Sequence, residues 1–217
     1  MLGEPLLRLR LRAPRGTVSV PVLIEGGTHL RDSLDIARHA DRMRTGASTL
    51  FPDAFEREVM RWNGLSEVIA RAGRALLTPR LLASRESLIE SFPPLIPKAV
   101  RGVSVPIAEQ AVRYIATKYG VRDEEREQHR ATLRAALAQV RDALGDEPYL
   151  VHAAGYTYAD IAIACALQFV EPAEELAALG PATRAAWTDP VLAPEHGDVL
   201  AWRDRVVAEH FVRQKLG

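Results

Sequence analysis

Residues 17–40 read TVSVPVLIEGGTHLRDSLDIARHA, and this stretch decides how the first part of the chain folds. An apolar run is interrupted by Val20-Pro21, a glycine turn follows, and Asp32-Ser33 precedes a segment with helical spacing. A proline cannot donate a hydrogen bond to a neighbouring strand, so it belongs at a strand edge or in a special turn, often with a cis peptide bond. A cis bond here would turn the backbone groups of Val20 outward, where they can meet a ligand.

The pair Asp32-Ser33 predicts the start of a helix. Unpaired N–H groups and the positive end of the helix dipole make such a place favourable for a carboxylate. Serine and aspartate are also the preferred capping residues for purely local reasons, so a plain strand, turn and capped helix fits the same residues. Both interpretations stay open on this segment alone.

A second informative segment, residues 147–170, reads EPYLVHAAGYTYADIAIACALQFV. Thr157 as N-cap and Asp160 at the third helical position form a capping box, which fixes where a helix begins. The run IAIACAL that follows is apolar all round, as in a helix enclosed by other helices. We therefore expect Cys165 to be a buried small apolar residue. Residues 198–211 predict a late helix with Trp202 on its apolar stripe.

Taken together and in this order, the two segments resemble the glutathione transferase family. The resemblance implies an α+β fold that is mostly α: a truncated thioredoxin-like part followed by an all-α helical domain. It implies that Val20 and Pro21 give main-chain hydrogen bonds to the cysteinyl part of glutathione, while Asp32 and Ser33 hold its γ-glutamyl part. Aspartate stands where the family usually has glutamate or glutamine.

The same resemblance implies glutathione as co-substrate, an apolar electrophile as second substrate, and a homodimer. Met60 and Trp62, with residues 78–104, are candidates for lining the electrophile pocket between domains. The alternative, that each is an ordinary core or surface-loop residue, stays open and is favoured for any one of them.

The start of the sequence departs from the family pattern. Family members begin with a strand and helix that carry a catalytic Tyr, Ser or Cys, and only 20 residues precede Pro21 here. Residues 1–16 contain no hydroxyl or thiol, so the catalytic residue is unknown. The catalytic segment is expected to be absent, through a misplaced start or a natural loss. Two functions stay open: glutathione conjugation in a full-length form, or a non-catalytic binding or assembly module.

Leu7, Leu9 and Leu11 alternate with arginines, a period of two that predicts a strand. We expect residues 6–12 to pair with the strand over residues 17–24 and so cover its open edge, or a second copy of the chain to cover that edge.

The predicted division is a thioredoxin-like part over 1–43, a linker over 44–52 and a helical domain over 53–217. Apolar residues recur with helical spacing over residues 52–76, 84–91, 106–119 and 123–144, so a helix is predicted in each of these ranges.

Composition excludes several function classes. Basic and acidic residues balance at 28 each, which argues against a nucleic-acid partner. No apolar run approaches a membrane span and no signal-peptide core is present, so we predict no membrane partner and a cytoplasmic location. The six histidines show no metal-ligand spacing, so no metal site is expected. Phosphate-loop and hydrolase motifs are absent as well.

Overall fold

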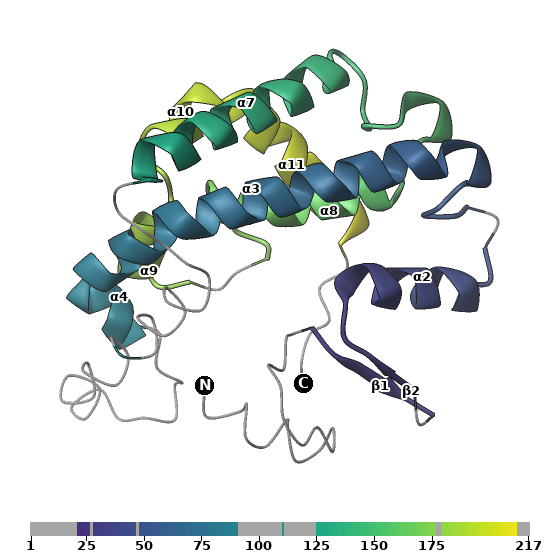
Figure 1. Cartoon of the computed structure of the whole chain (residues 1–217), viewed down its shortest axis with the longest axis horizontal. Helices are drawn as coiled ribbons and strands as arrows, with labels where there is room; N and C mark the ends of the chain where they lie inside the picture. The colour runs from purple at the N-terminus through teal and green to yellow at the C-terminus, as the bar shows by residue number, and fades with distance from the viewer. Residues whose placement is uncertain are drawn as a thin grey trace. The chain divides into compact units, whose positions relative to one another are not determined.

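The structure is a computed structural model that describes residues 21–26, 28–46, 48–90, 110, 125–176 and 179–211. The chain forms two compact units, Met1–Glu56 and Arg57–Gly217. Most of the described elements are helices (Figure 1), so the predicted mostly-α fold is confirmed.

The first unit contains a hairpin and a helix. Strands β1 (Leu23–Glu25) and β2 (Thr28–Leu30) pair antiparallel, with Leu23 opposite Leu30. The turn between them includes Gly26 at φ +52°, a backbone conformation that glycine adopts at no steric cost. The predicted pairing with residues 6–12 lies outside the described residues.

Helix α2 (Ser33–Met43) follows the hairpin. Its start is fixed by Asp32, whose carboxylate accepts a hydrogen bond from Leu34 N at 2.8 Å. His39 on the helix lies 2.6 Å from the Glu25 carboxylate on β1, which ties helix to hairpin. None of the described residues of this unit is buried.

After α2, the chain folds back on the helix through Asp41. This carboxylate accepts from Thr49 Oγ1 at 2.7 Å and from Leu50 N at 2.9 Å. A 3-10 turn, η1 (Asp53–Phe55), then leads into α3 (Glu56–Ala83). The division predicted at residues 44–52 stays a prediction.

The second unit is a helical bundle. After α3 come α4 (Arg85–Glu90), α7 (Arg126–Leu144), η3 (His152–Ala154), α8 (Tyr158–Ala166), η4 (Leu167–Phe169), α9 (Pro181–Trp187), α10 (Leu192–Glu195) and α11 (Gly197–His210). The predicted helices over 52–76, 84–91 and 198–211 correspond to α3, α4 and α11. The predicted end of α7 before Gly145 is also observed. Its predicted cap, Asp123, and the predicted helix over 106–119, apart from the helical residue 110, fall outside the described residues.

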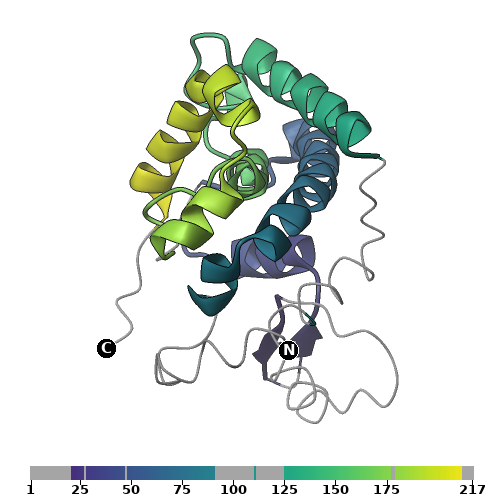
Figure 2. The same cartoon turned by 90° about the vertical axis from the view of Figure 1, so that its left-hand side faces the viewer.

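Helix α8 forms the middle of the bundle. Figure 2 shows it nearly end-on with α3, α7 and α11 around it. Ala159, Ile163 and Ala164 on α8 are fully buried, as are Val59 and Ile69 on α3, Leu137 and Val140 on α7, and Leu167 and Leu192 nearby. Burial of an apolar side chain contributes roughly 1.5–3 kcal/mol, so these residues stabilise the helical unit.

Two expectations about side chains are wrong. Cys165 is exposed, because it lies with Ile161 on a stripe of α8, continued by Gln168 in η4, that the described part of the bundle does not fully cover. Trp62 is 1% exposed and packs in the core, because its position on α3 faces the other helices; it does not line an open pocket.

Candidate functional site

The structure describes three of the four residues predicted to contact glutathione. Val20, and with it the predicted cis bond, lies outside the description. Pro21 is exposed and precedes β1, while Asp32 and Ser33 are exposed at the start of α2. All three belong to the first unit.

The start of α2 has unused polar groups. One carboxylate oxygen of Asp32 accepts from Leu34 N, whereas no described residue bonds to the other oxygen. The Ser33 hydroxyl likewise has no hydrogen-bond partner among the described residues. Hydroxyl and N–H donors with the positive end of an 11-residue helix can bind a carboxylate. The predicted role of these residues stays a prediction.

Thr157 and Asp160 lie in the second unit and have a structural role. Thr157 Oγ1 accepts from Ala159 N at 3.3 Å, and Asp160 accepts from Thr157 N at 2.8 Å and from Leu150 N at 2.9 Å. The structure thus contains the capping box expected from the sequence. Burial raises the pKa of Asp160, and the hydrogen bonds from Leu150 and Thr157 oppose that shift.

Three aromatic side chains gather near the end of α11, a cluster that sequence reasoning missed. Tyr149 Oη lies 3.0 Å from His210 Nε2. The Tyr156 ring stacks on His210 with centroids 3.7 Å apart, and Tyr149 meets Tyr156 edge-on at 5.8 Å. Burial raises the pKa of Tyr156 above its ordinary value. Tyr149 and His210 are 61 residues apart in the sequence, so no local motif could reveal the cluster.

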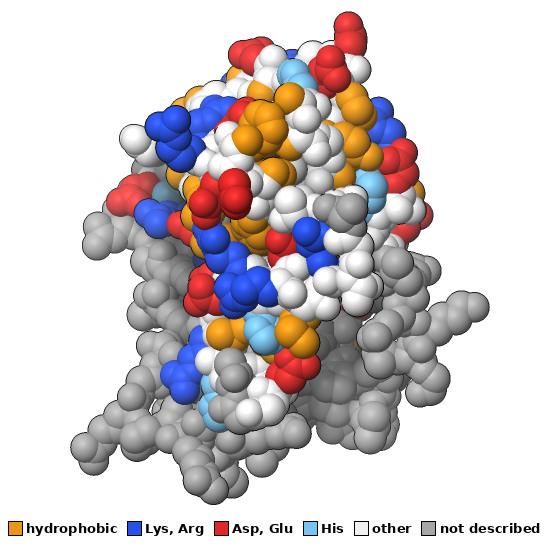
Figure 3. Space-filling view, turned by 90° about the vertical axis from the view of Figure 1, so that its right-hand side faces the viewer, with side chains coloured by type: hydrophobic (Ala, Val, Ile, Leu, Met, Phe, Trp, Pro, Cys, Tyr) orange, Lys and Arg blue, Asp and Glu red, His pale blue; other side chains and the backbone are white. Residues whose placement is uncertain are grey.

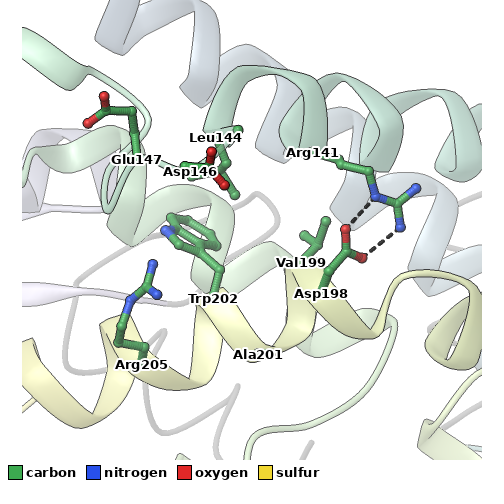
Figure 4. A pocket seen from close by; sticks show the side chains of 10 residues that line it. Arg141, Leu144, Asp146, Glu147, Asp198, Val199, Ala201, Trp202 and Arg205 are labelled. Atoms are coloured by element: carbon green, nitrogen blue, oxygen red, sulfur yellow. Dashed lines mark hydrogen bonds and ion pairs between the residues drawn. The ribbon is translucent and has the colours of Figure 1, made fainter.

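A pocket of about 330 Å³ lies where α7 ends against α11. Figure 4 shows Arg141 and Asp198 facing each other on one side, and Asp146, Trp202 and Arg205 on the other. The lining side chains include no hydroxyl, thiol or imidazole. Among the described residues, the ionisable side chains that line this pocket are therefore carboxylates and guanidiniums.

The charged pair in this pocket is structural. Arg141 donates to Asp198 at 2.6 Å and to the Glu195 carbonyl at 2.8 Å, which joins α7 to the start of α11. The hydrogen bonds from Arg141 lower the pKa of Asp198 to about 2. Trp202 is also engaged, because its Nε1 donates to the Pro148 carbonyl at 2.8 Å.

Charges of both signs are interspersed on the face shown in Figure 3, with no large patch of one sign among the coloured side chains. Within the described part of the chain, no group of three or more His, Cys, Asp or Glu side chains could hold a metal ion. The described helices also include none that is long and apolar enough to cross a membrane.

Comparison with known proteins gives one match. Residues 123–205 match the family model of the glutathione S-transferase C-terminal domain. The matched range includes α7, α8, α9, α10 and most of α11. The resemblance predicted from the sequence is thereby confirmed for this part of the chain. Neither the curated proteins nor the solved structures include a significant match.

Proposed function

We propose that this chain binds glutathione at the start of α2 and takes part in conjugating it to an apolar electrophile. The observation that carries the proposal is the exposed Ser33 hydroxyl, unpartnered within the described residues, at a helix start in a chain that also matches a glutathione S-transferase domain.

Each part of glutathione has a counterpart in this arrangement. The Ser33 hydroxyl and the N–H groups of the first turn of α2 would donate to the γ-glutamyl carboxylate. The second carboxylate oxygen of Asp32 would accept from the γ-glutamyl ammonium group. The backbone beside Pro21 would pair with the cysteinyl part, in the way that a strand edge binds an extended peptide.

A second candidate function, glutathione binding without conjugation, is favoured by where the hydroxyls lie. Conjugation needs a donor that stabilises the thiolate. In the first unit Ser33 is assigned to the carboxylate, and Thr49 donates to Asp41. Thr45 and Ser48 follow the opposite end of α2. No hydroxyl of known position in this unit is thus available for the thiol.

Calorimetric titration with glutathione tests the binding site. Ser33→Ala should weaken binding roughly 10-fold or more, because a hydrogen bond to a charged group contributes about 1.5–3 kcal/mol. Ser48→Ala is the matched control, since it removes an exposed serine hydroxyl from the same unit. Equal loss in both variants, or no glutathione binding by the parent chain, would refute the site.

An assay with glutathione and an aryl chloride separates the two candidate functions. Turnover well above background that Ser33→Ala reduces would favour the transferase. Binding without turnover would favour the non-catalytic module.

A further inference from the structure

The pocket of about 330 Å³ between the end of α7 and α11 has walls that are joined on both of its sides. On one side, Arg141 of α7 donates to the Asp198 carboxylate of α11. On the other side, Trp202 of α11 donates to the carbonyl of Pro148, in the loop that follows α7. The pocket is therefore preformed, as ligand sites usually are.

The turn that follows α7 has a fixed backbone and an acidic surface. Gly145 N donates to the Arg141 carbonyl at 3.1 Å, and Glu147 N donates to the Leu144 carbonyl at 2.8 Å. Asp146 and Glu147 in this turn line the pocket and are exposed. The C-terminal end of the 19-residue helix α7 adds partial negative charge. This wall of the pocket therefore attracts cations.

Three charged side chains that line the pocket have no hydrogen bond or ion pair within the described part of the chain: Asp146, Glu147 and Arg205. In Figure 4 the two carboxylates are drawn above the Trp202 indole and the Arg205 guanidinium below it, and no dashed line joins them. The ion pair on the other side of the pocket is neutral overall. The free charges are thus two negative and one positive.

The pocket also has an apolar surface. Leu144, Val199 and Trp202 line it and are almost fully buried. A ligand with a hydrocarbon stem can pack its stem on such a surface while its charged ends reach the exposed carboxylates and guanidinium.

We infer that this pocket binds a free basic amino acid, arginine or lysine. The α-carboxylate of the ligand pairs with Arg205, and its two cationic groups pair with Asp146 and Glu147. The two positive charges and one negative charge of such a ligand are the complement of the free charges in the pocket. A neutral amino acid would leave one of the two carboxylates unpaired. The volume of about 330 Å³ suits a molecule of this size.

Isothermal titration of the full chain at low ionic strength tests the class of ligand. The probes are L-arginine and three analogues: agmatine lacks the carboxylate, citrulline lacks the side-chain cation, and Nα-acetylarginine lacks the ammonium group. We expect arginine to bind roughly 5-fold more tightly than each analogue, because each analogue lacks one exposed ion pair.

One comparison separates the proposed site from a merely acidic surface. Such a surface would bind agmatine, which has two positive charges and no negative one, at least as tightly as arginine. That result overturns the proposal. Arginine binding no tighter than that of citrulline or Nα-acetylarginine, or absent at millimolar concentration, overturns it as well.

Variants test the location. Arg205→Gln should weaken arginine binding and leave agmatine binding unchanged, because agmatine has no carboxylate for Arg205. Asp146→Asn and Glu147→Gln should each weaken the binding of both ligands. The controls are Arg71→Gln and Asp142→Asn, which make the same charge changes at exposed residues that do not line the pocket. Arginine affinity unchanged in any of the three pocket variants, or lost equally in the controls, would refute this site.

The inference does not depend on the proposed glutathione site, since this pocket belongs to the other unit. Ser33→Ala should leave arginine binding unchanged, and Arg205→Gln should leave glutathione binding unchanged. Failure of either proposal is thus visible separately.

Discussion

At the residue scale, Gly73 shows how closely the helices of the bundle approach one another. A Cβ at this position of α3 would lie 2.5 Å from the Phe169 Cβ of η4, well inside van der Waals contact. Because both atoms are attached directly to backbone, neither can rotate away. Glycine is required here by packing rather than by conformation.

Gly73→Ala should therefore destabilise the protein by about 1–3 kcal/mol, as overpacking of a core does. Gly64→Ala on the same helix is the control, because no atom of the described residues lies within 4 Å of its Cβ position. That change should be neutral or stabilise the helix by about 0.5–1 kcal/mol. Urea unfolding of both variants checks this, and equal effects would contradict the close approach.

His196 is a second residue whose environment has a measurable consequence. Its side chain is 3% exposed, and neither ring nitrogen has a hydrogen-bond partner among the described residues. Burial is the main cause that lowers its pKa, and Arg141 lowers it further, while Asp198 and Glu195 oppose the shift. Protonation thus favours the unfolded chain.

We expect the free energy of unfolding to fall as pH decreases through the unfolded-state pKa, about 6.5, toward the lower folded-state value. His196→Leu removes the titrating group, so it should show a flatter profile between pH 7.5 and 5. His29→Gln, at an exposed histidine, should keep the parent profile. Unfolding in urea across this pH range measures it; parallel profiles for His196→Leu and the parent would show that His196 does not titrate abnormally.

Cys165 shows where residue-level prediction fails. The composition of α8 correctly indicates an enclosed helix, but it does not reveal which stripe its neighbours leave uncovered. That depends on helix crossing geometry, which no single segment encodes.

At the element scale, the predictable helices are those whose ends carry their own chemistry. The Thr157 and Asp160 pair defined the start of α8, Gly145 the end of α7, and Asp32 the start of α2. Strand β2 was not predicted, because three residues are too few for a periodic pattern. The pocket between the end of α7 and α11 was equally absent from the sequence predictions, because its residues come from distant segments.

The capping box of α8 yields a prediction at this scale. Thr157→Ala should cost about 1 kcal/mol, the usual effect of removing an N-cap. Asp160→Ala should cost roughly 3 kcal/mol, because it leaves the buried N–H groups of Leu150 and Thr157 without acceptors.

Chemical denaturation gives both values. Asp142→Ala, an exposed acidic change on α7, is the control and should stay within about 0.5 kcal/mol of the parent. If Asp160→Ala cost no more than Asp142→Ala, the capping box would not stabilise the fold.

At the scale of the whole molecule, the two units differ in how they are stabilised. Every buried side chain of the described residues belongs to the helical unit. The first unit is held by polar links instead, among them Glu25 to His39 and Asp41 to Thr49. The family resemblance confirmed over residues 123–205 concerns the unit with the core, whereas the proposed glutathione site lies on the other.

An NMR titration of the ¹⁵N-labelled chain with glutathione tests the central claim most directly, because it reports where the ligand binds. We predict saturable shifts of the backbone amides of Ser33 and Leu34 at the start of α2, and of Val22 after Pro21. Shifts confined to residues of the helical unit, or no shifts at millimolar glutathione, would contradict the account.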